Sequence, residues 1–187
     1  MSARDVFRRI IAALDGAGIH HMLTGSFASS YHGSPRATQD IDLVIETDEP
    51  RTRRFVHSLP TAEYYADEGA AVEAVRNETH FNVVDLATGW KIDLIVRKSR
   101  LFSVEEFARR RTVEFEGTRL SVATAEDLII AKLEWAKKGE SNRQIEDVAM
   151  ILKLRATELD DAYLHRWVER LSLESEWIAA RSRAGLA

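Results

Sequence analysis

The chain has no cysteine among its 187 residues. This absence excludes disulfide scaffolds, thiol catalysis and cysteine-ligated zinc sites. Proline and glycine are scarce too, with three and nine residues, whereas apolar residues make up 45% and charged residues 30%. Such a composition is typical of a folded globular protein and excludes disordered and fibrous chains.

A long apolar run is also missing. No uninterrupted apolar stretch approaches the ~20 residues of a membrane-spanning helix, and residues 1–18 lack the apolar centre and the cleavage site of a signal peptide. We therefore expect a cytoplasmic protein that has no membrane partner.

Basic residues do not predominate. Lys and Arg number 26 against 30 Asp and Glu, which gives a formal net charge of −4. A protein that coats nucleic acid without specificity is basic over its whole surface, so this class is disfavoured and a local basic groove stays open. Neither G-x-x-x-x-G-K-[ST] nor G-x-G-x-x-G occurs, which excludes a P-loop and a dinucleotide fingerprint.

Hydrophobic periodicity predicts mixed α/β structure in the first two thirds of the chain. Runs rich in β-branched residues predict strands, and apolar residues at helical spacing predict helices. The predicted strands are 20–25, 40–45, 80–85, 90–96 and two small ones within 112–122. The predicted helices are one that ends near Gly16, 26–33, 49–58, 68–77 and one opened by a capping box at Ser103.

From Thr124 onward the pattern is helical throughout, with predicted helices at 124–138, 141–154, 158–171 and 174–183. This change predicts two parts, a mixed α/β core at 1–123 and a helical region at 124–187. The predicted fold class is α/β (α+β), a small mixed sheet flanked by helices and followed by the helical region.

Two carboxylates stand close together in one predicted strand. Asp40 and Asp42 are two residues apart and therefore point to the same face of a sheet. A divalent cation would relieve their repulsion, and Mg²⁺ prefers oxygen ligands. An exposed, solvated pair is the alternative. Asp93 lies in a similar β-branched stretch, where burial without a partner would be costly.

Gly25 and Ser26 follow the strand predicted at 20–25. A glycine at a turn from strand to helix lets the backbone approach a phosphate, and a serine hydroxyl can donate a hydrogen bond to it. An ordinary turn would have the same sequence. The pair is therefore informative only together with the carboxylates.

Gly25, Ser26, Asp40, Asp42 and Asp93 together resemble the motifs of the nucleotidyltransferase superfamily with a polymerase-beta-like fold. The stretch GSPRATQDIDL at 33–43 looks particularly like bacterial stand-alone members, similar to toxin–antitoxin and abortive-infection nucleotidyltransferases. The resemblance covers most of 19–96 and continues more weakly to about residue 154. It implies a nucleotidyltransferase core at 1–123 and a helical region at 124–187 that closes the cleft.

The resemblance also implies two-metal nucleotidyl transfer with Mg²⁺ or Mn²⁺. Asp40 and Asp42 would hold one ion on the NTP triphosphate and would share a second with Asp93, which would assist deprotonation of the acceptor hydroxyl. The carboxylate oxygens are then expected within roughly 3–6 Å of one another. Gly25 and Ser26 would bind the triphosphate and stabilise the leaving pyrophosphate.

Two basic residues are candidates for nucleotide binding. Arg36 could clamp a phosphate or pin the loop before Asp40, and Lys132 on the apolar stripe of its helix could reach a phosphate or extend to solvent. A similar Lys…Arg…Asp arrangement borders the nucleotide site in toxin-like nucleotidyltransferases. Whether Arg143 and Asp147 belong to the site or form a surface ion pair stays open.

Two functions are therefore carried forward. The first is an enzyme that moves a nucleoside monophosphate from an NTP to an acceptor hydroxyl. The acceptor would be a tRNA or other RNA end, a protein or a small molecule. An RNA or protein acceptor would place the enzyme in a toxin–antitoxin or phage-defence system, with a cognate toxin or antitoxin as partner. The second is a non-catalytic module that holds a nucleotide or a partner. The complete set of Asp40, Asp42 and Asp93 favours the enzyme.

Overall fold

The computed structural model describes residues 3–35, 37–139 and 141–186. Within these residues every helix is too short or too polar to cross a membrane. The chain divides into two compact units, one formed by Met1–Phe27 and Ala37–Ala123 and the other by Ala28–Arg36 and Thr124–Ala187.

In the described part of the chain, the first unit holds a seven-stranded sheet with the order β3-β4-β5-β2-β1-β7-β6. The strands are β1 (His20–Leu23), β2 (Asp40–Glu46), β3 (Tyr64–Ala66), β4 (His80–Asp85), β5 (Lys91–Val96), β6 (Arg111–Phe115) and β7 (Thr118–Val122). The pairs β2–β5 and β1–β7 are parallel and the others antiparallel. The predicted mixed sheet is confirmed.

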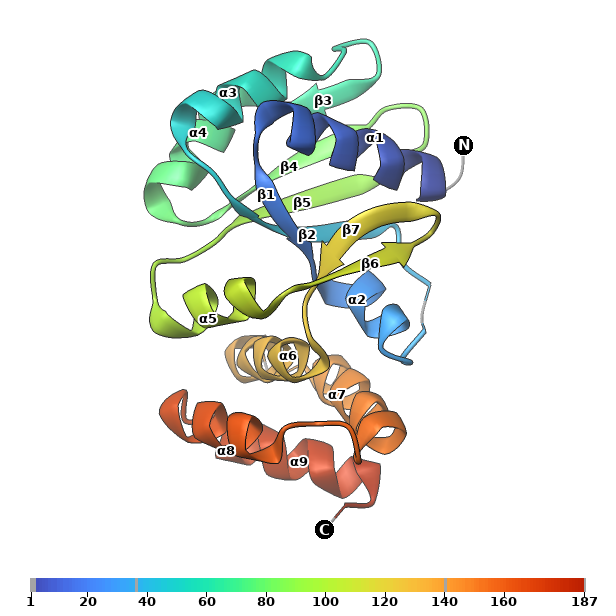
Figure 1. Cartoon of the computed structure of the whole chain (residues 1–187), viewed down its shortest axis with the longest axis vertical. Coiled ribbons are helices and arrows are strands. Elements are labelled where there is room, and N and C mark those ends of the chain that lie inside the picture. Colours follow the sequence, from blue (N-terminus) through green and yellow to red (C-terminus); the bar gives the residue numbers. More distant parts are fainter. Residues whose placement is uncertain (1–2, 36, 140, 187) are drawn as a thin grey trace. The chain divides into compact units, whose positions relative to one another are not determined.

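Alternating residues of the central strands separate a core face from a polar face. The helices of this unit are α1 (Ala3–Ala17), α3 (Glu49–Ser58), α4 (Glu68–Asn77), α5 (Leu101–Arg109) and the first turn of α2 (Gly25–Tyr31). Figure 1 shows α1, α3 and α4 on one side of the sheet. Ile41, Leu43, Ile92 and Leu94 are fully buried, so the residues between them point to the opposite face.

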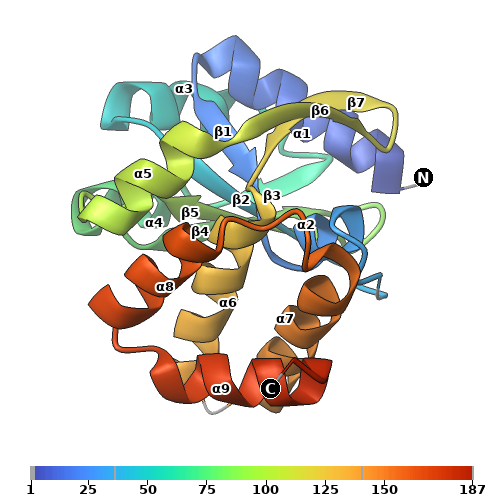
Figure 2. The same ribbon diagram turned by 60° about the horizontal axis from the view of Figure 1, so that its bottom comes forward.

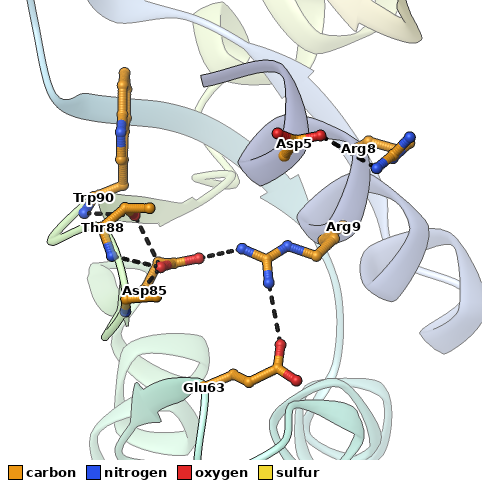
Figure 3. A network of polar contacts seen from close by, with 8 residues as sticks. Asp5, Arg8, Arg9, Glu63, Asp85, Thr88 and Trp90 are labelled. Atoms are coloured by element: carbon orange, nitrogen blue, oxygen red, sulfur yellow. Dashed lines mark hydrogen bonds and ion pairs between the residues drawn. The ribbon is translucent and has the colours of Figure 1, made fainter. Parts of the chain in front are cut away.

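Arg9 of α1 ties this helix to the hairpin that leads into β5. Its guanidinium donates hydrogen bonds to Asp85, at the end of β4, and to Glu63 at 3.1 Å (Figure 3). Asp85 is buried, and its Oδ1 accepts from the backbone N–H and the hydroxyl of Thr88 at 3.0 and 2.8 Å. Because β5 begins directly after the turn between β4 and β5, the network helps to fix the position of Asp93 along the sheet.

The second unit is helical, with α6 (Ala125–Gly139), α7 (Asn142–Arg155), α8 (Asp161–Arg170) and α9 (Glu174–Ala184). Helix α9 packs against α6, α7 and α8 (Figure 2). The segment 28–36, which includes the end of α2, belongs to this unit. Arg155 Nε donates to the carbonyl oxygen of His32 at 3.1 Å, and the Leu154 side chain lies against Gly33.

Two predicted helix starts are wrong. Helix α5 begins at Leu101, so Ser103 lies inside it and does not cap it. The early start buries Phe102, and full burial of a Phe stabilises by about 1.5–3 kcal/mol, more than a typical cap of ~1 kcal/mol. The helix expected from residue 158 begins later, because the Asp160 side chain accepts from the backbone N–H of Tyr163 at 2.9 Å and caps α8.

Candidate active site

The predicted carboxylates lie on the polar face of the sheet, on two neighbouring strands. Asp42 of β2 stands directly opposite Asp93 of β5, and Asp40 stands opposite Lys91. Strands in a sheet are about 4.8 Å apart, so the side chains of Asp42 and Asp93 start beside each other. Asp40 is exposed, whereas Asp42 and Asp93 are half-buried.

The three carboxylates do not form a closed cluster. Among the residues that the structure describes, no group of three or more His, Asp or Glu side chains is gathered closely enough to hold a metal ion. The expected convergence of all three is therefore not seen. Instead, Lys91 Nζ lies 2.9 Å from Oδ1 and 3.1 Å from Oδ2 of Asp93, so a lysine ammonium engages this carboxylate.

Lys91 lies among the candidate carboxylates, although it is not part of the motifs found in the sequence. Its pKa is raised because Asp93 accepts a hydrogen bond from it, and the charges of Asp93, Asp40 and Asp42 act in the same direction against the effect of burial. The ammonium thus lies in the negative field of all three carboxylates. The sequence indicates this position, because residues two apart in a strand share a face of the sheet and Lys91 lies two residues before Asp93.

Gly25 begins α2 directly beside Asp42. The backbone N–H of Thr24 donates to the carbonyl oxygen of Asp42 at 3.0 Å. Gly25 has a φ of +63°, and a Cβ atom there would lie 2.0 Å from Asp42 Oδ2. A side chain at this position would be strained and would overlap the carboxylate, so the close approach requires glycine. Ser26 follows and is buried. The structure therefore brings Gly25 to Asp42.

The two basic residues predicted to bind nucleotide have different outcomes. Arg36 lies outside the described residues. Lys132 belongs to α6 of the second unit, where it is 4% exposed; its Nζ lies 2.6 Å from Asp147 Oδ2 and 3.0 Å from Gln144 Oε1 of α7. Asp147 is therefore an ion-pair partner of this buried lysine.

The polar face has the chemistry of a cation site. Its donors are carboxylate oxygens, the ligands that Mg²⁺ and Mn²⁺ prefer. The Lys91 ammonium already occupies this field as a monovalent cation, which shows that the carboxylates attract positive charge. The donor types, with the glycine turn against Asp42, therefore match a divalent cation that carries a phosphate, although the three carboxylates of the described chain are not gathered around one point.

The known proteins that resemble this chain are nucleotidyltransferases or nucleotidyltransferase-like proteins. The model of a family described as nucleotidyl transferase AbiEii toxin, type IV toxin–antitoxin system, matches residues 9–181. No curated protein sequence matches the chain.

Several solved structures share the fold. An antigenic nucleotidyltransferase-like protein from Paracoccidioides brasiliensis is 16% identical with a TM-score of 0.56, over 95% of this chain and 91% of that one. ANT(2'')-Ia in complex with adenylyl-2''-tobramycin is 14% identical with a TM-score of 0.58, over 95% and 99%. JHP933 from Helicobacter pylori is 15% identical with a TM-score of 0.50, over 100% and 92%.

Proposed function

Because the chain belongs to the AbiEii family of nucleotidyl transferase toxins from type IV toxin–antitoxin systems, we propose that it moves a nucleoside monophosphate from an NTP to an acceptor hydroxyl, with Mg²⁺ or Mn²⁺ as cofactor. The match spans nearly the whole chain, which supports nucleotidyl transfer as the activity. The observation that carries the proposal is the register that sets Asp42 opposite Asp93, with Gly25 against Asp42.

In this proposal Asp40, Asp42 and Asp93 hold the divalent cations. When bound, the ions neutralise the triphosphate and lower the pKa of the acceptor hydroxyl. Asp93 takes the proton of that hydroxyl. The acceptor oxygen then bonds to the α-phosphorus, the bond from the α-phosphorus to the β-phosphate oxygen breaks, and pyrophosphate leaves with its electron pair.

Other residues of the chain would position the nucleotide. Gly25 leaves the backbone bare beside Asp42, so a phosphate can approach closely, and the Ser26 hydroxyl would donate to it. Lys132 would neutralise a phosphate, with Asp147 orienting its ammonium. Arg36 remains a predicted phosphate clamp.

We propose an RNA end, a protein hydroxyl or a small molecule as the acceptor, and a cognate antitoxin as partner. The family supports the toxin–antitoxin setting. ANT(2'')-Ia, which shares the fold, is solved with adenylyl-2''-tobramycin, and supports a small molecule as one acceptor class to test. The alternative is a non-catalytic module that binds a nucleotide or a partner at the same face.

Asp42→Asn tests the activity. The substitution keeps the shape of the side chain but removes a negative ligand, so we expect a loss of ~10³-fold or more in transfer rate. Its melting temperature without metal should be unchanged or raised, because one repelling charge is lost. The assay incubates each radiolabelled NTP with total tRNA, lysate protein and a panel of aminoglycosides and lincosamides.

The matched control is Asp15→Asn, which changes an exposed aspartate of α1 and should label acceptors like wild type. Label on one acceptor with wild type and the control, but not with Asp42→Asn, supports the enzyme and identifies the acceptor class. If wild type labels nothing and binds a neighbouring gene product tightly, the binding module replaces the enzyme.

A further inference from the structure

A lysine stands within the carboxylates of the proposed site. Lys91 is opposite Asp40 in the register of β2 and β5, and its Nζ lies within hydrogen-bond distance of both oxygens of Asp93. Its side chain is 43% exposed, against 18% for that of Asp93. The ammonium therefore reaches a more buried carboxylate from the solvent side.

The same carboxylates have no structural need to be close together. Asp42 and Asp93 are adjacent across the strands, and Asp40 follows two residues away on the same face. Like charges at such separations repel each other by an amount that grows with burial. Lys91 offsets this repulsion in the protein without metal.

We propose that Lys91 is a built-in counter-ion, which holds Asp93 in the metal-free protein and competes with the divalent cation for the carboxylates. The inference rests on the proposed function, in which these carboxylates bind the cation. Lys91 Nζ lies within hydrogen-bond distance of both oxygens of Asp93, so a cation that takes both oxygens must displace the ammonium. Lys91 is thus a positioning residue that lowers metal affinity and keeps Asp93 in place until metal arrives.

The side chain suits this role. A lysine ammonium is a point charge on a flexible four-carbon stem, and a partly exposed one can move to solvent without leaving a buried charge behind. A lysine side chain with its ordinary pKa of ~10.4 is cationic at neutral pH. Lys91 therefore needs no change of protonation when the divalent cation displaces its ammonium from Asp93.

Lys91→Met, with Lys91→Gln as a second variant that retains a polar group, tests the proposal. We expect Mn²⁺ to bind the nucleotide-free variants about tenfold tighter than wild type in calorimetry, because a competing positive charge is gone. In EDTA both variants should melt several degrees below wild type, and saturating Mn²⁺ should remove the difference. Lys98→Met, an exposed lysine after β5, is the matched control and should bind Mn²⁺ like wild type.

The outcomes separate this inference from the proposed function. If wild type binds Mn²⁺, Asp42→Asn does not, and the Lys91 variants bind with unchanged or weaker affinity, the counter-ion role is overturned while the carboxylate metal site stands. If wild type does not bind Mn²⁺, or Asp42→Asn binds it equally well, the metal role of the carboxylates falls, and the competition assigned to Lys91 falls with it.

Discussion

At the scale of single residues, the site depends on a contact that only glycine permits. Gly25 adopts a left-handed conformation, and the space of its missing Cβ is filled by the Asp42 carboxylate. The contact places the start of α2 against the start of β2, where Asp40 and Asp42 lie. Gly25 therefore has two constraints at once, a backbone that favours glycine and a neighbour that tolerates nothing larger.

Gly25→Ala should damage both stability and transfer. The positive φ costs an alanine about 1–2 kcal/mol, and the new methyl group must push the Asp42 carboxylate away. We expect a lower melting temperature and a loss of label transfer that added Mn²⁺ does not restore. Calorimetric melting and the transfer assay are the measurements.

Gly16→Ala is the control for this change. Gly16 is in α1, is exposed and has open space where a Cβ would stand, so alanine should leave transfer intact and raise stability by up to ~1 kcal/mol. Wild-type transfer in Gly25→Ala would show that the close contact with Asp42 is not needed.

At the scale of elements, helices α3 and α4 are joined by charged side chains. Glu68 of α4 accepts from His57 Nε2 at 2.5 Å and from Arg53 of α3. Arg76 of α4 donates to Glu49 of α3 at 2.7 Å. These contacts lie at the surface, where ion pairs add little stability. The small contribution is present at neutral pH and is lost as the carboxylates take up protons.

The pH dependence of unfolding should reveal this contact. The pKa of Glu68 is held below its ordinary value of 4.5, mainly by the hydrogen bond from His57. Near and below that value the unfolded chain takes up protons that the folded chain does not, so the stability from Glu68 is present at higher pH and is lost as pH falls. Glu68→Gln should therefore flatten the fall in unfolding free energy below about pH 5.

Urea denaturation over a series of pH values measures this slope. Glu73→Gln, an exposed glutamate on the same helix, is the matched control and should follow the wild-type curve. An unchanged slope for Glu68→Gln would mean that the contact with His57 does not persist in solution.

At the scale of the whole molecule, the two units are not two consecutive pieces of chain. The first unit is interrupted after Phe27, and residues 28–36 belong to the same unit as residues 124–187. His32 and Gly33 of this insert contact Arg155 and Leu154 at the end of α7. The helical unit therefore contains a segment from the first fifth of the chain.

This interleaving predicts how fragments behave. A fragment of residues 124–187 lacks the insert that covers the end of α7, so we expect it to show no cooperative thermal transition by circular dichroism. Fusing residues 28–36 to its start through a flexible linker should restore a cooperative transition. Cooperative unfolding of the bare fragment at the temperature of the fused one would show that the insert adds no stability.

Local patterns in the sequence determined most elements and the residues of the carboxylate face. The alternation in 40–45 and 90–96 predicts which side chains share a face, because this property depends only on the backbone of one strand. The helices predicted at 49–58 and 68–77 and the hairpin predicted at 80–96 are also confirmed. Each of them follows from the pattern of apolar residues and turn residues within one short segment. Gly25, Ser26, Asp40 and Asp42 lie within one short stretch of sequence, so their motif can be recognised without knowledge of the fold.

Only the tertiary structure decided which distant residues meet. The register that sets Asp42 against Asp93 and Lys91 against Asp40 joins segments about fifty residues apart, and no periodicity within one strand encodes it. Pairing of Lys132 with Asp147 and the place of residues 28–36 likewise arise from packing between elements. Strand order and the charges it brings together follow from burying the core as a whole, which local spacing cannot specify.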